Sequence, residues 1–433
     1  MNKKFFSIII PIYNSAKFLN RCVKSIYAQK FKDLQVVLIN DCSTDGSQTM
    51  CKEYKKKFKL DLINHKKNLG VAISRNEGIK NAKGKYLIFL DSDDFLLKNS
   101  LEQLKKTIEK NNFPEVILNN CERNRVPQNY NHLLKYFDNK IYTNNNFFKI
   151  LNKNRIILNE CWSLIISNKM IKKNKVFFKN IKIIEDQGFV IKVFILMKSI
   201  IINKNPILFH RSRLDSLKHT LGIESAYSYI VTLEDLCKLL QKYEYSKNIK
   251  RYLKFRILRI IFYLGAYISL LKKGEIIKLS KRISFSIRQI KKFKNIDYTK
   301  SVYSNLENKK TLEIINNHKN FVKNKVIFSL KKTKYKFDGI FIFCADMLAE
   351  SVVKILKEKK FKINNIYDDD LNFKGKKILN VSIKSLPKNN FKKKDISKKI
   401  FLICNLDKKF FFNIRSKLIK KGFFRDRILH LSF

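Results

Sequence analysis

The first hundred residues alternate between short apolar runs and amphipathic segments, and this pattern limits the fold more than any other feature of the chain. Apolar runs at 5–12, 34–40, 60–63 and 86–90 have the length of β-strands. The first run is apolar throughout, as expected for a strand buried on both faces of a parallel sheet. Segments with helical spacing follow the first three runs. Repeated strand–helix units of this kind predict an α/β fold with a doubly wound, mostly parallel sheet.

Polar side chains stand where three of these predicted strands end. Asn14, Asp41 and Asp91 follow the first, second and fourth runs. Ligands of open α/β sheets bind beyond the carboxyl ends of the strands. We therefore expect the functional site at this edge of the sheet.

The strongest chemical signal is the sequence LDSDD at 90–94. Three carboxylates within four residues repel one another unless a cation neutralises them. Mg²⁺ or Mn²⁺ would do so through oxygen ligands and would also bridge phosphate oxygens. The alternative is a solvated acidic turn in which Ser92 or Asp94 caps the next helix. The motif alone does not decide between the two.

Four segments together resemble glycosyltransferase family 2, whose catalytic domain has the GT-A fold. They are SIIIPIYN at 7–14, VVLINDCSTDGS at 36–47, NLGVAISRNEGIKNAKGKYLIFLDSDD at 68–94, and an ED pair followed by Phe three residues on at 185–189. Their order, spacing and strand context fit over roughly the first 220 residues. The resemblance implies metal-assisted transfer of a sugar from a nucleoside-diphosphate donor.

The resemblance also implies which residues hold the nucleotide. Pro11, Tyr13 and Asp41 would hold the base, where the Asp41 carboxylate can accept the imide N–H of uracil. A turn or cap role is the alternative for Asp41, but Asp45 fills that role at least as well. Arg75 would face the donor phosphates, for which a guanidinium is well suited.

The same resemblance assigns the acidic motif to ribose and metal. Asp91 and Asp93 match the family's ribose and metal carboxylates, with Asp93 as the direct metal ligand and Asp94 in support. Ser92 is grouped with the nucleotide-sugar-binding residues. The expected cofactor is Mn²⁺ or Mg²⁺, which would stabilise the departing diphosphate as a Lewis acid.

A base must also deprotonate the acceptor hydroxyl. Asp186 matches the base of the family's inverting members, and Glu185 is the second candidate. The alternative is that both are simply acidic residues favoured at a helix N-terminus. Trp162 lies where family members line the acceptor side, although a single tryptophan is more often a core residue.

The segment at 209–220 resembles the Tyr-x-x-Arg-x-x-Ser ending of many family 2 catalytic domains. Arg213 and Ser216 would fit that pattern. His210 or His219 could approach the phosphates or the metal.

The chain is expected to contain three parts: a GT-A catalytic domain at 1–222, a helical region and linker at 223–334, and a small Rossmann-like α/β domain at 335–433. In the last part, Cys344, Ala345 and Asp346 replace the Gly-Ala-Gly turn of such domains. An aspartate there would repel a pyrophosphate. We therefore expect a degenerate Rossmann-like fold that does not bind a dinucleotide.

The charge composition of the chain bears on which partners it could bind. The chain has 91 Lys and Arg against 36 Asp and Glu, a formal charge of +55, which would attract nucleic acid or an anionic membrane face. The lysines are spread along the chain, so a compositional origin is the competing explanation.

The eight cysteines form no C-x-x-C pair and hence neither a zinc spacing nor a short disulfide framework. A cytoplasmic location is expected, with peripheral attachment to the inner face of the cytoplasmic membrane as an alternative.

The family resemblance implies transfer of a sugar, with inversion, from a UDP-sugar to a hydroxyl of a surface glycan such as a capsule or lipo-oligosaccharide. The partners are then a nucleotide-sugar donor and a glycan or lipid-linked glycan acceptor, with no nucleic acid. One alternative is a sugar nucleotidyltransferase, but residues 11–15 lack the Gly-rich loop it should carry. A second is a nucleic-acid-binding protein that depends on the basic charge. A third, a catalytically dead scaffold, disagrees with the intact acidic residues.

Overall fold

The computed structural model describes residues 4–123, 131–211, 223–242 and 244–270, together with shorter stretches between 274 and 431. The chain forms two compact units. The first consists of Met1–Thr220 and Tyr227–Ile257, and the second of Leu221–Ala226 and Leu258–Phe433. Each unit is described by itself.

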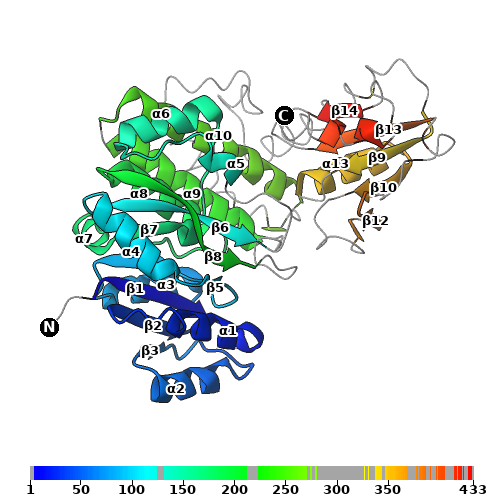
Figure 1. The fold of residues 1–433 in the computed structure, drawn as a ribbon. Helices are drawn as coiled ribbons and strands as arrows, with labels where there is room; N and C mark the ends of the chain where they lie inside the picture. The colour runs from blue at the N-terminus through cyan, green and yellow to red at the C-terminus, as the bar shows by residue number, and fades with distance from the viewer. Residues whose placement is uncertain are drawn as a thin grey trace. The chain divides into compact units, whose positions relative to one another are not determined.

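An eight-stranded sheet forms the first unit, in the order β3-β2-β1-β4-β7-β6-β8-β5 (Figure 1). The strands are β1 (Phe6–Ile12), β2 (Leu34–Asn40), β3 (Asp61–Asn64), β4 (Tyr86–Phe89), β5 (Phe95–Leu96), β6 (Val116–Arg123), β7 (Leu164–Ser167) and β8 (Ile200–His210). Strands β1 to β4 are parallel, and so are β6 and β8. Strand β7 is antiparallel to both β4 and β6, and β5 is antiparallel to β8. The prediction of a mostly parallel sheet is confirmed.

Strand β1 explains why its sequence is apolar without interruption. All seven of its residues are buried, between β2 on one side and β4 on the other. Helix α3 (Val71–Asn81) packs against it so closely that a Cβ on Gly78 would lie 2.2 Å from Cγ2 of Ile9. Glycine is therefore required at this contact, and it brings α3 close to the centre of the sheet.

Ten further helical segments belong to this part of the chain or continue from it. They are α1 (Ala16–Tyr27), α2 (Ser47–Lys57), α4 (Ser100–Lys110), α5 (Asn131–Leu134), α6 (Asn144–Asn154), η1 (Cys161–Ser163), α7 (Asn168–Lys173), α8 (Glu185–Leu196), α9 (Ile223–Lys242) and α10 (Lys247–Leu270). The last two correspond to the helical pattern expected after residue 222. Most residues between 271 and 336 lie outside the described part of the chain. The three-part division at 222 and 334 therefore stays a prediction.

The second unit contains a six-stranded sheet in the order β11-β12-β10-β9-β13-β14. Its elements are β9 (Gly339–Phe343), α13 (Met347–Glu358), β10 (Ile363–Tyr367), β11 (Lys377–Ile378), β12 (Val381–Lys384), β13 (Lys399–Cys404) and β14 (Ile428–Leu431). Every pair is parallel except β11 with β12. From β12 to β14 the sheet has the 3-2-1-4-5 strand order of a Rossmann-like fold. The predicted second α/β sheet is confirmed.

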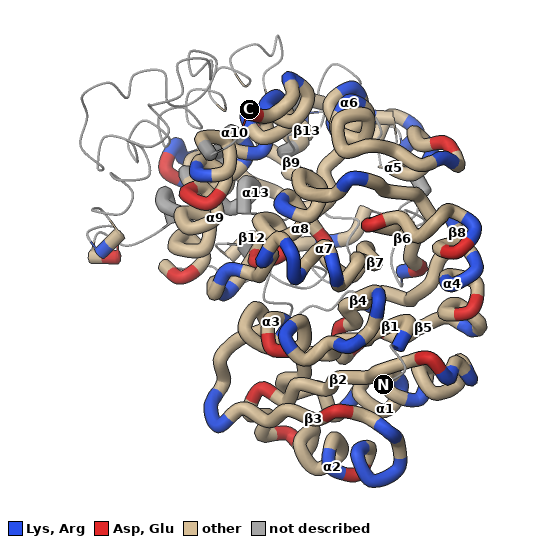
Figure 2. Tube along the Cα trace, turned by 90° about the vertical axis from the view of Figure 1, so that its left-hand side faces the viewer, with Lys and Arg blue, Asp and Glu red and all other residues tan. Residues whose placement is uncertain are grey.

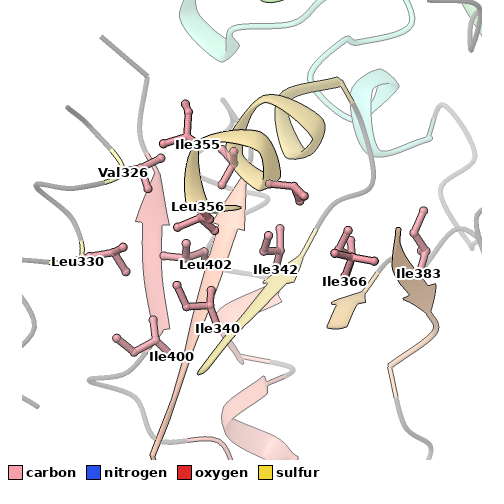
Figure 3. Packing of buried hydrophobic residues seen from close by; sticks show 13 residues of the cluster. Val326, Leu330, Ile340, Ile342, Ile355, Leu356, Ile366, Ile383, Ile400 and Leu402 are labelled. Atoms are coloured by element: carbon pink, nitrogen blue, oxygen red, sulfur yellow. The ribbon is translucent and has the colours of Figure 1, made fainter. Parts of the chain in front are cut away.

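Two apolar cores cover the two faces of this second sheet. On one face Ile340, Ile342 and Leu402 pack with Leu356 of α13 (Figure 3). The other face is aromatic and includes Phe343 and Phe401. The replaced glycine turn, at 344–346, lies outside the described residues, so the expected loss of dinucleotide binding stays a prediction.

Basic residues occur on helices and loops throughout the described chain, with acidic residues among them (Figure 2). This distribution agrees with the compositional explanation of the net charge of +55. No helix in the described parts of the chain has the length and apolar character needed to cross a membrane.

Candidate active site

The acidic motif follows β4, and its four polar residues, 91–94, have different environments. Asp94 is buried, with Oδ2 at 2.9 Å from Nδ1 of His210 and Oδ1 accepting the backbone N–H of Arg211 at 2.7 Å. Nε of Arg211 also donates to the carbonyl oxygen of Asp93 at 3.2 Å. Burial raises the pKa of Asp94, and the hydrogen bond and charge of His210 oppose that shift. Asp94 therefore links the end of β8 to the motif, a contact different from the supporting role beside the metal that was predicted for it.

Ser92 connects the motif to the end of β1. Its hydroxyl lies 2.7 Å from that of Ser15, and the backbone N–H of Ser15 donates to Oγ of Ser47 at 2.9 Å. Ser47 in turn donates to Asp45, whose other oxygen accepts the first N–H of α1, from Ala16, at 2.9 Å. Asp45 thus fills the capping role that was the alternative for Asp41. The loops after β1, β2 and β4 form one hydrogen-bonded group, as expected at this edge of the sheet.

Arg75, from α3, brings three of the predicted site residues together. Its side chain is only 4% exposed. Nη1 donates to Oε1 of Glu185 at 2.7 Å and to Oδ1 of Asp186 at 2.9 Å, and Nη2 donates to Oδ1 of Asp91 at 2.9 Å. The guanidinium also lies 5.4 Å from the ring centre of Phe178. One permanent cation therefore neutralises carboxylates from the β4 end and from the start of α8.

Glu185 and Asp186 form the first turn of α8, where acidic side chains interact favourably with the helix dipole. Oδ2 of Asp186 also accepts the backbone N–H of Cys161 at 3.3 Å. Burial, followed by the nearby charge of Asp186, raises the pKa of Glu185 to about 8, although Arg75 opposes the shift. The two side chains are hydrogen-bonded to each other. Glu185 thus retains a proton near neutral pH.

Asp41, predicted to bind the base, makes contacts that the sequence did not indicate. Its Oδ1 lies 2.7 Å from Nδ1 of His65 and accepts the N–H of Leu69 at 2.8 Å, and its Oδ2 accepts the N–H of Gly70 at 2.8 Å. The carboxylate therefore holds the loop between β3 and α3. Sequence analysis missed His65, whose only signal is its place two residues after the third predicted strand. The base-binding role of Asp41 stays a prediction.

Tyr13 and Pro11 lie at the end of β1 beside this loop group. Tyr13 is 50% exposed, the largest exposed fraction among the large hydrophobic side chains of the described residues, whereas Pro11 is buried within the strand. An exposed aromatic ring beyond a strand end is available to stack on a base, but a buried proline can only shape the backbone there.

Trp162 is buried and packs against His210, the histidine that contacts Asp94 of the acidic motif. Its ring is stacked on His210, with ring centroids 4.5 Å apart and an interplanar angle of 15°. The guanidinium of Arg123 lies 5.3 Å from the indole centre. Trp162 is thus a core residue in this arrangement, which was the alternative to sugar stacking. Arg213, Ser216 and His219 lie outside the described residues.

The acidic motif can accommodate a divalent cation together with donor phosphates. Among the described residues there is no group of three or more His, Cys, Asp or Glu side chains that could hold a metal. Mg²⁺ in nucleotide enzymes, however, is commonly held by one or two carboxylates together with substrate phosphates. Asp91 is 26% exposed and Asp93 is partly exposed, so these two carboxylates fit such a site. Asp94 does not, since His210 and Arg211 occupy both of its oxygens.

Comparison with known proteins agrees with this geometry. Residues 7–174 match the Glycosyl transferase family 2 profile, and this stretch includes Asp41, Arg75 and the acidic motif. The chain carries a glycosyltransferase family 2 domain. Glu185, Asp186 and the helices from α8 onward lie beyond the matched stretch.

Two curated relatives cover about half of the chain. Glycosyltransferase GlyA of Streptococcus pneumoniae is 27% identical over 246 residues, which are 55% of this chain and 35% of GlyA. The cholesterol galactosyltransferase of Borreliella burgdorferi is 26% identical over 250 residues, 55% of this chain and 69% of that protein. The chain thus matches only about a third of the length of GlyA.

The solved structures of S. aureus TarS 1-349 are similar in fold. The complex with UDP-GlcNAc has a TM-score of 0.58 at 21% identity and covers 76% of this chain and 93% of TarS 1-349. The complex with UDP has a TM-score of 0.56 at 19% identity, with 76% and 92% covered. The predicted GT-A-type fold is confirmed.

Proposed function

We propose that this family 2 enzyme transfers a hexosyl or N-acetylhexosaminyl group from a UDP-sugar to a hydroxyl of a surface glycan, with inversion. The observation that carries the proposal is the cluster in which Arg75 joins Asp91 to Glu185 and Asp186. In this cluster Arg75 joins the acidic motif, which would face the donor, to the Asp186 carboxylate, which would accept the proton. The structure of TarS with UDP-GlcNAc supports UDP as the nucleotide.

On the donor side, Tyr13 would stack on the base, with Asp41 and Pro11 shaping the same end of the sheet. Arg75 would face the diphosphate, and Asp91 and Ser92 would contact the ribose and the sugar. Asp93, with Asp91, would hold Mn²⁺ or Mg²⁺, which when bound withdraws charge from the leaving diphosphate. The exposed ring of Tyr13 and the partly exposed carboxylates of the motif support this arrangement.

On the acceptor side, Asp186 would take the proton of the attacking hydroxyl as general base. Two contacts orient its carboxylate, one from Arg75 and one from the Cys161 amide. Glu185 cannot accept a proton at neutral pH while it already carries one, given its pKa of about 8. A base on the face opposite the diphosphate is what inversion requires.

The acceptor is proposed to be a glycan or a lipid-linked glycan of the cell surface, of the capsule or lipo-oligosaccharide type. Catalysis would then take place in the cytoplasm or at the inner face of the cytoplasmic membrane. The support is by analogy: the relatives include a cholesterol galactosyltransferase, whose acceptor is a lipid.

Calorimetry with a set of donors tests the proposal. UDP-, GDP-, CDP- and dTDP-sugars are titrated with Mn²⁺ or with EDTA against wild type, Asp93→Ala and, as a control, Asp138→Asn, whose carboxylate is exposed. We expect metal-dependent binding of UDP-sugars that Asp93→Ala loses and Asp138→Asn keeps. Absence of binding to every nucleotide would contradict the proposal. Release of pyrophosphate from a nucleoside triphosphate and a sugar phosphate would instead indicate a nucleotidyltransferase.

A further inference from the structure

Arg256 of α10 has an unusual environment for a charged residue. It lies well beyond the stretch that matches the family profile, and its side chain is only 2% exposed. Guanidinium groups stay protonated in proteins, so a full positive charge is buried here. Such a charge is costly to bury unless hydrogen bonds satisfy it.

The hydrogen bonds of Arg256 all go to neutral oxygens. Nη1 donates to the carbonyl oxygen of Leu158 at 3.4 Å and to the hydroxyl of Tyr252 at 3.3 Å. Nη2 donates to Oδ1 of Asn159 at 2.5 Å and to Oε1 of Gln187 at 3.0 Å. Within the described residues, no carboxylate forms an ion pair with it. In the described part of the chain, Arg256 is therefore not the counter-ion of a buried acid.

Two of these partners flank the proposed base. Gln187 directly follows Asp186 in α8, and Asn159 lies two residues before Cys161, whose N–H donates to Oδ2 of Asp186 at 3.3 Å. The guanidinium thus bridges two segments that meet at the Asp186 carboxylate. A rigid planar group with donors at fixed spacing is suited to holding two amide oxygens at a set separation.

An apolar side chain would fill the same space without the cost of burying a charge, so packing alone does not account for arginine here. We infer that Arg256 is a positioning residue: it fixes the two segments on either side of Asp186 and thereby the orientation of the base. The inference rests on the proposed function, in which Asp186 is the base. It assigns a part in catalysis to α10, a helix that lies beyond the matched family stretch.

The test compares Arg256→Met and Arg256→Lys with Leu253→Ala, which truncates a fully buried side chain of the same helix that cannot form hydrogen bonds. UDP release from UDP-GlcNAc gives kcat and KM, thermal unfolding gives Tm, and hydrogen exchange is followed in 158–163 and 185–190. For Arg256→Met we expect kcat to fall by about 100-fold with KM for the donor changed by less than about threefold. Arg256→Lys should recover part of that loss. Leu253→Ala should lower Tm but keep kcat within about threefold.

Hydrogen exchange distinguishes failure of this inference from failure of the proposed function. If Arg256 positions the segments 158–163 and 185–190, the Cys161 amide should exchange faster in Arg256→Met than in wild type. In Leu253→Ala its exchange rate should equal that of wild type. Both expectations hold whether or not UDP-GlcNAc is a donor. A wild type that releases no UDP while exchange changes as expected would put the choice of donor in doubt and leave the structural role supported. Equal loss of kcat in Arg256→Met and Leu253→Ala at equal loss of Tm would overturn the inference. So would unchanged exchange in both segments. Should Arg256→Met fail to fold, Arg256→Lys carries the same comparison.

Discussion

Nη1 of Arg75 lies 2.9 Å from Oδ1 of Asp186, although the two residues are 111 positions apart in the sequence. Arg75 comes from α3, within the stretch that matches the family profile, and Asp186 from the start of α8, beyond it. Through Asp91, the same guanidinium also reaches the acidic motif. Donor-side and acceptor-side residues of the proposed reaction therefore share one counter-ion, and several consequences of that arrangement can be measured.

Replacing Arg75 should destabilise the protein. Arg75→Met leaves Asp91, Glu185 and Asp186 without their cation, and breaking a buried charge pair typically costs about 3–5 kcal/mol. Arg75→Lys keeps the charge but not the planar set of donors, so an intermediate loss is expected. Urea unfolding measures both, with Arg251→Met, at an exposed site on α10, as the control. A loss for Arg75→Met no larger than that of the control would contradict the importance of the cluster.

The two acids at the start of α8 should respond differently to replacement by the corresponding amides. Asp186→Asn removes the proposed base, and kcat should fall by about 10²–10⁴-fold. Glu185→Gln resembles the protonated Glu185 side chain, because it keeps an acceptor oxygen for Arg75 and a donor for Asp186. Its kcat at pH 7 should stay within about tenfold of wild type. Steady-state UDP release measures both variants, and the opposite ranking would make Glu185 the base.

Stability should depend on pH through Glu185. Its pKa of about 8 in the folded protein exceeds its ordinary value of 4.5, so between these values the folded protein retains a proton that the unfolded chain loses. The contribution of Glu185 to the free energy of unfolding is therefore largest below about pH 4.5. It decreases as the pH rises towards 8, by at most about 1.4 kcal/mol per pH unit.

Urea unfolding of wild type and Glu185→Gln at intervals from pH 5 to pH 8 tests this dependence. The difference between the two proteins isolates Glu185 from other groups such as Asp94. Glu185→Gln should gain stability relative to wild type as pH rises. A constant difference across this range would show that the Glu185 pKa is not raised.

The sheet was predictable because its information is local. The apolar run of β1 signals burial on both faces within seven residues, and the acidic motif follows β4 directly. Both features follow from residue order and the two-residue or 3.6-residue periodicity of strands and helices. The assignment of Arg75 to the donor phosphates came from the family resemblance and not from these patterns, and it stays a prediction.

Partnerships over long distances were not predictable from residue patterns. Asp94 with His210 and Arg256 with Asn159 are 116 and 97 positions apart. Periodicity shows that a side chain faces the core but not which side chain it meets there. The exposure of Trp162 was ambiguous for that reason, and it is decided by stacking on His210, which comes from β8. The partners of Asp41 lie nearer in the sequence, but a loop between β3 and α3 carries no periodic signal.

Asp41 provides a test of whether the base is read directly or through the loop that this residue holds. Asp41→Asn replaces one acceptor oxygen with an amide NH₂ group. That group then faces other hydrogen-bond donors: His65 and the N–H of Leu69 at one position, or the N–H of Gly70 at the other. A buried hydrogen-bonding group left unsatisfied costs about 1–3 kcal/mol. We therefore expect a loss of stability of that size, measured by urea unfolding, whichever role Asp41 has.

Nucleotide preference separates the two roles. A carboxylate accepts the imide N–H of uracil, whereas the asparagine amino group can donate to the ring nitrogen of cytosine, which is an acceptor. If Asp41 contacts the base, calorimetry on Asp41→Asn should show weaker UDP binding and a shift in preference towards CDP. If Asp41 acts only through the loop between β3 and α3, affinity for UDP and CDP should fall by the same factor. His65→Gln is the matched variant: it disturbs the loop but leaves the Asp41 carboxylate intact, so it should weaken both nucleotides equally in either case.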